Sequence, residues 1–380
     1  MNQPPTPLAI YIHWPFCRSK CPYCDFNSHV RERIDPRTWT SALVADLDRQ
    51  AELAPDREVV SIFFGGGTPS LMPPDTAAAL IERVKRHWRT APDLEITLEA
   101  NPNSAEAKRF AGFAAAGVNR LSLGIQALRP DALKFLGRGH DRDEAIAAIK
   151  LSRGLFKRTS FDLIYARPEQ SLDAWADELD EALALAGEHL SLYQLTIEPG
   201  TAFHTRAKTG ELRPLDDETA AAMFELTQER LAASGRPAYE ISNHARPGGE
   251  CRHNLAYWRY EDYLGIGPGA HGRFTKGGVR YATRQRRLPE AWLRQPTFEE
   301  MAPIGRETAI EEMVMMGLRL AKGIPRARLE ALADCDVETL FGVSLARLIG
   351  GGFIALDGER FRATAAGRQR LNAVLGTLFG

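Results

Sequence analysis

The chain has 380 residues, 44% of them apolar, and a formal net charge of −1. This length favours one large domain followed by a smaller one. The near-neutral charge gives no overall attraction to nucleic acid or anionic lipid, and no apolar run is long enough to cross a bilayer. Because the N-terminus also lacks the pattern of a secretory signal, we expect a cytoplasmic protein, with weak attachment to a membrane surface left open.

Short apolar runs alternate with helical stretches over the first 200 residues. Six runs bounded by Gly, Pro, Asn or Asp are predicted strands, at Leu8–His13, Val59–Phe64, Leu94–Ala100, Arg120–Ile125, Thr159–Tyr165 and Leu190–Ile197. Helices are predicted between them, at Pro36–Leu53, Asp75–Trp88, Ala105–Ala116, Asp143–Arg153 and Leu172–Ala186. This alternation predicts an α/β fold of parallel strands with right-handed crossovers, either a closed or partial barrel or an open doubly wound sheet. In each case, functional residues are expected at the carboxyl ends of the strands.

The regular alternation of predicted strands and helices ends after Pro199. Here the sequence predicts a helix at Asp216–Ser234, a strand at Ala238–Ser242, a Gly- and aromatic-rich stretch at Asn243–His271 and a helix at Glu307–Ala321. The last segment reads as helix, hairpin and helix, over Val337–Gly350, Phe353–Leu356, Arg360–Ala363 and Ala365–Leu378, and resembles a winged-helix module. We therefore expect three regions: an α/β domain over 1–240, a connecting region over 241–305, and a winged-helix-like α+β domain over 306–380.

Three of the five cysteines lie within eight residues, directly after the first predicted strand: Cys17, Cys21 and Cys24. Each iron of a [4Fe–4S] cube normally takes one sulfur ligand, so three thiolates can hold three irons. The fourth iron is left open to a donor from outside the chain, and a molecule with an amine and a carboxylate would chelate it. The spacing C-x3-C-x2-C therefore predicts a cluster with one open iron.

Zinc and disulfides explain the triplet less well. Zinc sites usually need four protein ligands; Cys251 and Cys335 are remote in sequence, although His13 or His29 could complete a site. Disulfides would leave one of the three cysteines unmatched, and clustered reduced cysteines fit a reducing cytoplasm.

Glycine and polar residues follow the later strands. Gly65–Pro69, Gly-Gly-Gly-Thr-Pro, follows the second strand and lets the backbone approach a ligand closely, but it lacks the G-K-[ST] of a phosphate loop. Glu99, Gln126 and Asp162 stand at the ends of the next three strands, where they are expected to face one mouth. Arg138 could neutralise a ligand carboxylate with its fork of donors.

Together these residues resemble the radical S-adenosylmethionine superfamily, and more closely its coproporphyrinogen-dehydrogenase-like branch. The resemblance covers most of the chain and implies a partial (β/α)6 TIM-like barrel, with the cluster in the loop after the first strand. It implies that Cys17, Cys21 and Cys24 are the iron ligands of a [4Fe–4S] cluster. It also implies contacts to S-adenosyl-L-methionine from Tyr11, Gly66, Gly67, Thr68, Glu99, Gln126, Arg138 and Asp162.

Two departures separate this chain from the oxygen-independent coproporphyrinogen dehydrogenases of that branch. Those enzymes carry a further cysteine two residues after the third ligand, where this chain has Phe26. They also carry a substantial N-terminal arm, whereas only 16 residues precede Cys17 here. Both features argue against porphyrinogen decarboxylation.

A third motif favours another member of the branch. The run His253-Asn-Leu-Ala-Tyr-Trp258 resembles the H-N-x-x-Y-W signature of haem chaperones. Imidazole is a common axial ligand of haem iron, and aromatic rings can stack on the macrocycle. His253 is therefore the candidate haem ligand, with Cys251 and His271 as alternatives.

The segment Arg273–Arg287 is rich in basic residues. It could meet haem propionates or an anionic membrane surface, and a solvated basic face is the plainer interpretation. No dense basic recognition helix is present in Val337–Gly350, so nucleic-acid binding is not expected.

We therefore expect a haem chaperone that binds haem, a [4Fe–4S] cluster and S-adenosyl-L-methionine and delivers haem to membrane haemoproteins. The alternative is an oxygen-independent coproporphyrinogen III dehydrogenase, which would decarboxylate propionates oxidatively through a radical. An electron donor and a homodimer are left open as partners, and no residue is assigned as catalytic.

Overall fold

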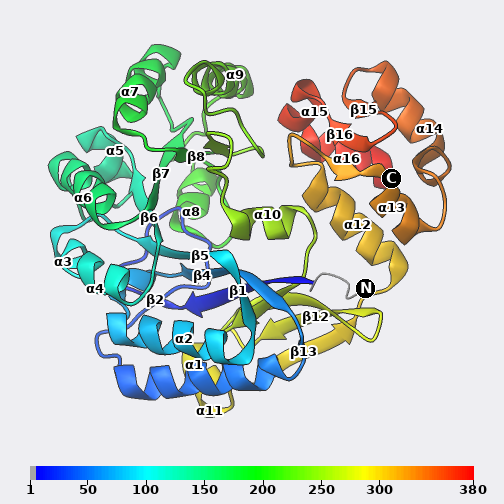
Figure 1. Cartoon of the computed structure of the whole chain (residues 1–380). Coiled ribbons are helices and arrows are strands. Elements are labelled where there is room, and N and C mark those ends of the chain that lie inside the picture. Colours follow the sequence, from blue (N-terminus) through cyan, green and yellow to red (C-terminus); the bar gives the residue numbers. More distant parts are fainter. Residues whose placement is uncertain (1–5) are drawn as a thin grey trace.

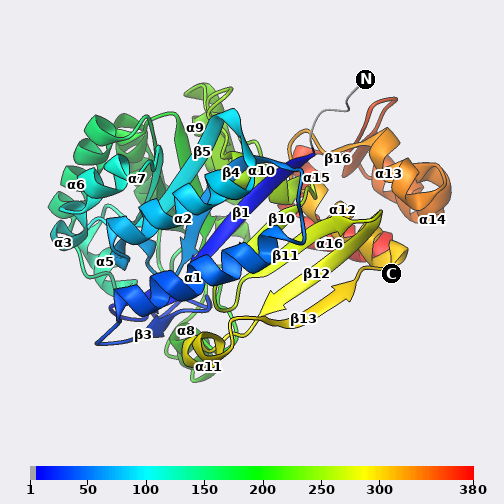
Figure 2. The same cartoon turned by 60° about the horizontal axis from the view of Figure 1, so that its bottom comes forward.

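The computed structural model describes residues 6–380 and contains an eleven-stranded mixed sheet (Figures 1 and 2). Its centre is a run of six parallel strands in chain order: β1 (Pro7–Trp14), β4 (Glu58–Gly66), β5 (Arg89–Ala100), β6 (Arg120–Gln126), β7 (Arg158–Tyr165) and β8 (His189–Gln194). The six predicted strands and the α/β class are confirmed. The last strand ends at Gln194 rather than Ile197.

Side-chain alternation along these strands separates the core from the inner face. In β6, Leu121 and Leu123 are buried in the hydrophobic core, whereas Ser122 and Gln126 are only half-buried. Successive side chains in a strand point to opposite faces. Apolar residues therefore pack against the helices, and small or polar residues are left for the inside of the curved sheet.

Helices connect the parallel strands and cover their outer face, as Figure 1 shows. They are α1 (Pro36–Ala51), α2 (Pro74–His87), α3 (Ser104–Ala107), α4 (Phe110–Ala115), α5 (Pro130–Phe135), α6 (Arg142–Leu155) and α7 (Leu172–Leu185). Two more helices, α8 (Ala202–Lys208) and α9 (Asp217–Ala233), follow β8, the last strand of the parallel run. In α2, Leu80 and Val84 lie on the buried face, and α6 begins with a capping box of Asp141 and Glu144. The single helix predicted over Ala105–Ala116 is wrong, because the chain forms the two short helices α3 and α4 there.

Further strands extend both edges of the sheet. On one side β10 (Tyr263–Ile266) pairs parallel with β1, and β11 (His271–Lys276), β12 (Val279–Gln285) and β13 (Phe298–Pro303) continue as an antiparallel meander. On the other side β9 (Asn243–Ala245) pairs antiparallel with β8. The strand predicted over Ala238–Ser242 is therefore wrong: only Ala238 makes an isolated bridge, and the strand itself follows that segment.

The C-terminal residues form a lobe of their own at the right of Figure 1. It contains α12 (Arg306–Gly317), β14 (Ile324–Pro325), α13 (Arg326–Ala333), α14 (Val337–Gly350), β15 (Ile354–Leu356), β16 (Arg360–Ala363), α15 (Ala365–Gln369) and α16 (Leu371–Phe379). The lobe has a separate hydrophobic core, which includes Leu329, Leu345 and Phe361. The predicted order of helix, hairpin and helix is confirmed, but the single helix predicted over Ala365–Leu378 is wrong, because the chain forms the two helices α15 and α16 there.

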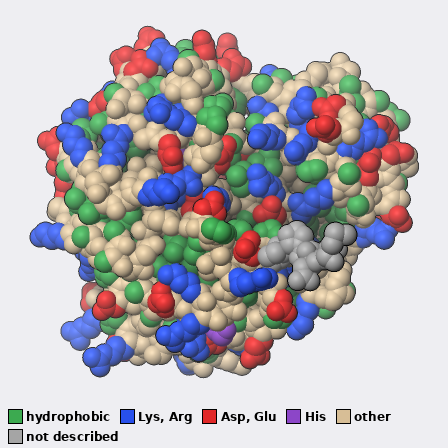
Figure 3. Space-filling view, in the orientation of Figure 1, with side chains coloured by type: hydrophobic (Ala, Val, Ile, Leu, Met, Phe, Trp, Pro, Cys, Tyr) green, Lys and Arg blue, Asp and Glu red, His purple; other side chains and the backbone are tan. Residues whose placement is uncertain are grey.

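Surface charge is mixed. Lys and Arg alternate with Asp and Glu over the face drawn in Figure 3, in keeping with the net charge of −1. None of the helices in residues 6–380 is both long and apolar enough to cross a bilayer.

Candidate cofactor site

A cavity of about 870 Å³ opens at the carboxyl ends of the parallel strands. Its wall is formed by the loop of residues 17–28, which we call the cluster loop, and by the ends of β4 to β8. The short strands β2 (Phe16–Cys17) and β3 (His29–Val30) pair with each other and close the base of the cluster loop.

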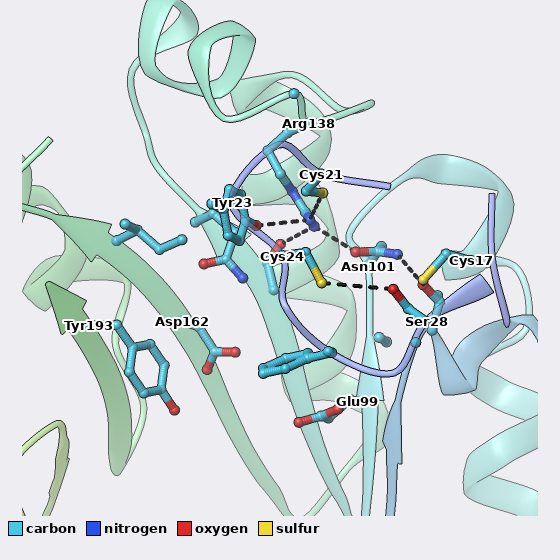
Figure 4. Close-up of a pocket in the computed structure, with 18 of the residues that line it drawn as sticks. Cys17, Cys21, Tyr23, Cys24, Ser28, Glu99, Asn101, Arg138, Asp162 and Tyr193 are labelled. Carbon is cyan, nitrogen blue, oxygen red and sulfur yellow. Dashed lines mark hydrogen bonds between the residues drawn. The ribbon is translucent and has the colours of Figure 1, made fainter. Parts of the chain in front are cut away.

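All three predicted cluster cysteines line this cavity, half-buried and with free thiols (Figure 4). Thr68 Oγ1 donates to Cys17 Sγ at 3.3 Å, and Arg138 Nη1 donates to Cys21 Sγ at 3.3 Å. Cys24 Sγ lies 3.8 Å from Ser28 Oγ. Burial raises the pKa of the thiols of Cys17 and Cys24, so their thiolates need a positive partner. Three thiols on one wall of the cavity, with a guanidinium beside that of Cys21, are the type of donor that an iron–sulfur cluster takes.

The alternative of a fourth ligand from His13 finds no support in the geometry. The Tyr11 hydroxyl lies 2.9 Å from His13 Nδ1, and the Asn27 carbonyl oxygen lies 2.9 Å from His13 Nε2. Both ring nitrogens are therefore engaged within the protein.

The glycine run at the end of β4 brings the chain against the cluster loop. Gly67 N donates to Trp14 O and Thr68 N donates to Phe16 O, both at 2.8 Å. A Cβ at Gly67 would lie 2.7 Å from the Phe16 carbonyl oxygen, and Gly66 has a positive φ of 116°. Only glycine fits this approach, so the run positions the cluster loop. Gly66, Gly67 and Thr68 also line the cavity.

Polar side chains from successive strands meet inside the cavity, as predicted. Glu99, Gln126 and Asp162 all line it. Burial, and then the neighbouring charge of Asp162, raises the pKa of Glu99 to about 8. Burial raises the pKa of Asp162 to about 6, against the opposing effect of hydrogen bonds from Ser191 and Ser122. Carboxyl groups with pKa values raised in this way are typical of binding and catalytic sites. Gln126 Oε1 is also buried without a hydrogen-bond partner among the described residues.

Arg138 also lines the cavity, where it joins the cluster loop to the sheet. Its Nη2 donates to Asn101 Oδ1 at 2.6 Å and to Gly124 O at 2.8 Å, while Nη1 faces Cys21 and the hydroxyl of Tyr23 (Figure 4). Its buried Nε has no partner in the described chain, so one donor is left for a ligand.

Two of the residues predicted to contact a cofactor, Tyr11 and His253, lie outside the cavity lining. Tyr11 lies on β1, and His253 lies on the short helix α10 (Arg252–Trp258). The ring centroids of these two residues are 6.1 Å apart in a stacked arrangement. Glu99 is close enough to Tyr11 to help raise the pKa of its phenol, after burial.

His253 is 1% exposed and lies under the inner face of the sheet. Ser61 Oγ lies 3.0 Å from Nδ1, and the Tyr257 hydroxyl lies 3.0 Å from Nε2. Burial lowers the pKa of His253 to about 3, so the ring is neutral. Both ring nitrogens are occupied in this arrangement.

The alternatives to His253 also have defined surroundings. Cys251 is buried and lies 3.4 Å from Glu95 Oε1, and burial raises the pKa of its thiol to about 12. His271 is exposed at the start of β11.

Half of the basic side chains in the segment Arg273–Arg287 form ion pairs, whereas Lys276, Arg286 and Arg287 form none among the described residues. Arg273 pairs with Glu312, Arg280 with Asp262, and Arg284 with Glu299 and Glu300. The run of positive charge seen in the sequence is therefore interrupted in space.

Sequence reasoning missed several residues of the cavity. Asn101, Tyr23, His140 and Tyr193 all line it. Asn101 directly follows β5, so its position at a strand end was the available signal. The other three gave no distinctive pattern in the sequence.

The cavity and its cysteines define an iron–sulfur protein of the partial-barrel class. The family model of the radical SAM superfamily matches residues 11–182, and that of the HemN C-terminal domain matches residues 304–370. Coproporphyrinogen III oxidase (HemN) from Escherichia coli has a similar fold, with a TM-score of 0.82 and 22% identity over 99% of this chain and 91% of that one. This match confirms the predicted TIM-like barrel with a C-terminal domain.

Relatives that match along nearly the whole chain show which group of the superfamily it resembles. A protein of Escherichia coli named haem chaperone HemW is 39% identical over 97% of both chains. The mouse protein named radical S-adenosyl methionine domain-containing protein 1, mitochondrial, is 37% identical over 100% of this chain and 90% of its own. The chain belongs to the radical SAM superfamily, in the group that includes the proteins named haem chaperone HemW. Its cofactors are accordingly a [4Fe–4S] cluster and S-adenosyl-L-methionine.

Proposed function

We propose that this protein is a haem chaperone of the radical SAM type, which binds haem and delivers it to membrane haemoproteins. The observation that carries the proposal is the similarity to relatives named haem chaperones, 36–39% identical over nearly the whole chain. Phe26 supports it, because the branch members that decarboxylate porphyrinogens have a cysteine there.

In this proposal Cys17, Cys21 and Cys24 hold the cluster. When bound, a cluster with an open iron supplies one low-potential electron and a site for a chelating amine and carboxylate. Arg138 and Thr68 orient two of the thiolates. The proposed contacts to S-adenosyl-L-methionine are Tyr11, Gly66, Gly67, Thr68, Glu99, Gln126, Arg138 and Asp162.

His253 is retained as the proposed axial haem ligand, on the strength of its signature. Binding of haem iron by His253 requires α10 to shift, because both ring nitrogens have hydrogen-bond partners in this structure. The test is a haem titration of His253→Ala followed by its Soret absorbance. Loss of the wild-type Soret position is expected, and an unchanged spectrum and affinity would remove His253 from the mechanism.

His140 provides the matched comparison for that titration. It is the histidine that lines the cavity, and its Nε2 lies 3.1 Å from the Ile125 carbonyl oxygen. If His140→Ala, rather than His253→Ala, changes the Soret band, the axial ligand lies inside the cavity.

The second candidate function is oxidative decarboxylation of coproporphyrinogen III, and the shared fold with the Escherichia coli oxidase favours it. Anaerobic incubation of the reconstituted protein with coproporphyrinogen III, S-adenosyl-L-methionine and a reductant separates the two. We expect no protoporphyrinogen at catalytic turnover. Repeated turnover would overturn the chaperone assignment.

Further proposals concern the protein partners and the cellular location of the chain. We infer a cytoplasmic protein, in peripheral contact with the membrane when haem is delivered, which takes electrons from a donor protein and is able to form a homodimer. For the chain itself we propose a barrel over 1–240, a connecting region over 241–305 and a winged-helix-like domain over 306–380. The separate core of the C-terminal lobe supports the last boundary.

A further inference from the structure

Two aromatic rings are unusually accessible inside the cavity. Phe26 on the cluster loop is 62% exposed, and Tyr193 on β8 is 40% exposed, and both line the cavity. Burial nevertheless raises the pKa of the Tyr193 phenol. A ring that is surrounded by protein, yet open to solvent, faces a hollow in the molecule. Aromatic surface left open in this way is a favourable contact for a planar ligand.

The wall near Tyr193 carries apolar side chains among polar ones, which are Gln194, Thr196, Glu198 and Ser242. Ile164 on β7, Leu195 after β8, Phe224 on α9 and Ile241 line the same cavity. Asp162 lies between Tyr193 and Cys24, as Figure 4 shows, and Glu99 lines the same cavity. The cavity thus combines the polar groups beside the cluster loop with four apolar side chains, Ile164, Leu195, Phe224 and Ile241, a combination expected of a site for an amphipathic ligand.

Two cations stand on the cluster loop without partners. Arg18 and Lys20 line the cavity and are exposed. Neither makes a salt bridge or a side-chain hydrogen bond within residues 6–380. Unpaired Lys and Arg beside a cavity with apolar side chains suit the carboxylates of a ligand whose body lies inside.

We propose that Phe26 and Tyr193, with the apolar side chains that line the same cavity, bind the macrocycle of a porphyrin, and that Arg18 and Lys20 meet its carboxylates. The ligand class is a planar conjugated ring with carboxylate side chains. This inference rests on the proposed function, since haem is such a ligand. S-adenosyl-L-methionine also has an aromatic ring and a carboxylate, so the experiment must separate the two.

Metal-free protoporphyrin IX is the best probe, because it presents the ring and carboxylates without an iron for axial ligands. It is titrated by fluorescence into cluster-reconstituted full-length protein saturated with S-adenosyl-L-methionine. Tyr193→Ala and Phe26→Ala are each expected to weaken binding by about 10-fold, and Tyr193→Phe is expected to bind as wild type does. Leu288→Ala is the matched control, since Leu288 is 60% exposed and lies outside the cavity lining.

The cations are tested with the same probe. The double variant Arg18→Ala, Lys20→Ala is expected to weaken binding of protoporphyrin IX by about 10-fold and to leave binding of its dimethyl ester unchanged. An equal effect on the acid and the ester would show that the two cations do not meet carboxylates and would overturn this part of the proposal.

Each further outcome decides a different claim. If the wild type binds haem but the aromatic variants bind protoporphyrin IX equally well, the subsite falls and the proposed function stands. If the wild type binds neither porphyrin, the proposed function itself falls. If the variants weaken S-adenosyl-L-methionine in equilibrium dialysis and leave protoporphyrin IX unaffected, the rings belong to the nucleoside site and the proposal is overturned.

Discussion

Glu99 carries a buried carboxyl group at the end of β5, beside Asp162, and both features favour its neutral form. An unfolded chain ionises this group near pH 4.5, whereas the folded protein holds its pKa at about 8. The stability associated with neutral Glu99 is therefore fully present below pH 4.5 and is lost as the pH rises toward 8. Through this group, the cofactor-free protein is therefore less stable against unfolding at pH 8 than at pH 5.

Glu99→Gln should remove this dependence in the cofactor-free protein. Measured by urea unfolding between pH 5 and 8, the stability advantage of the variant is expected to grow by at most about 1.4 kcal/mol per pH unit. Glu307→Gln, at an exposed position on α12, is the control and should show no such trend. A difference between Glu99→Gln and wild type that stays constant with pH would contradict the account.

Each cluster cysteine is expected to be needed for cluster loading. Cys17→Ala removes one of three thiolates, so iron content and the visible absorbance after reconstitution should fall to well under half of wild type. Cys335→Ala, at a half-buried position in the C-terminal lobe, should leave both unchanged. A full iron–sulfur complement in purified Cys17→Ala would show that the ligand assignment is wrong.

At the scale of elements, the β4 turn sets the position of the cluster loop. Gly67→Ala places a Cβ 2.7 Å from the Phe16 carbonyl oxygen, and a backbone atom cannot move aside without shifting Cys17. We expect cluster loading to fall severalfold while the folded protein persists. Gly154→Ala, where a Cβ meets nothing within 4 Å in α6, should load normally. Equal loading in both variants would contradict this role of the turn.

The parallel part of the fold follows closely from the sequence, because each strand is a short apolar run with a defined end. Glu99 and Gln126, at the ends of β5 and β6, reach one cavity together with Asp162, which lies in the middle of β7 rather than at its end. Alternate side chains of a strand share a face, so all three can point to the inside of the sheet. The antiparallel meander β11–β13 was not predicted, since its charged residues are paired across elements and obscure the alternation.

The H-N-x-x-Y-W motif does not by itself show how its side chains are packed. The sequence gives its residue types, but the seven-residue helix α10 turns His253 inward, against Ser61 and Phe63. At its other end, Arg319 of the C-terminal lobe lies over the Trp258 ring, 4.6 Å from the centroid. Long-range packing of this kind has no counterpart in local sequence, so burial of His253 could not be foreseen.

At the scale of the whole molecule, the barrel and the C-terminal lobe have distinct hydrophobic cores. Phe361 is fully buried in the second core, so Phe361→Ala should destabilise the lobe by about 3–5 kcal/mol. Thermal unfolding followed by circular dichroism should then show an early transition, while the cluster absorbance is lost only in a later one. Val343→Ala, at an 87% exposed position, is the control. Simultaneous loss of both signals would show that the two cores unfold as one unit.

A haem chaperone must bind haem and keep hold of it. The most direct measurement is a haem titration of the reconstituted full-length protein, followed by Soret absorbance after removal of free haem on a desalting column. We expect saturable binding of a defined number of haem molecules per chain, and we expect the bound haem to persist through the column. Absorbance that rises without saturation, or haem that is lost completely on the column, would contradict the proposed function.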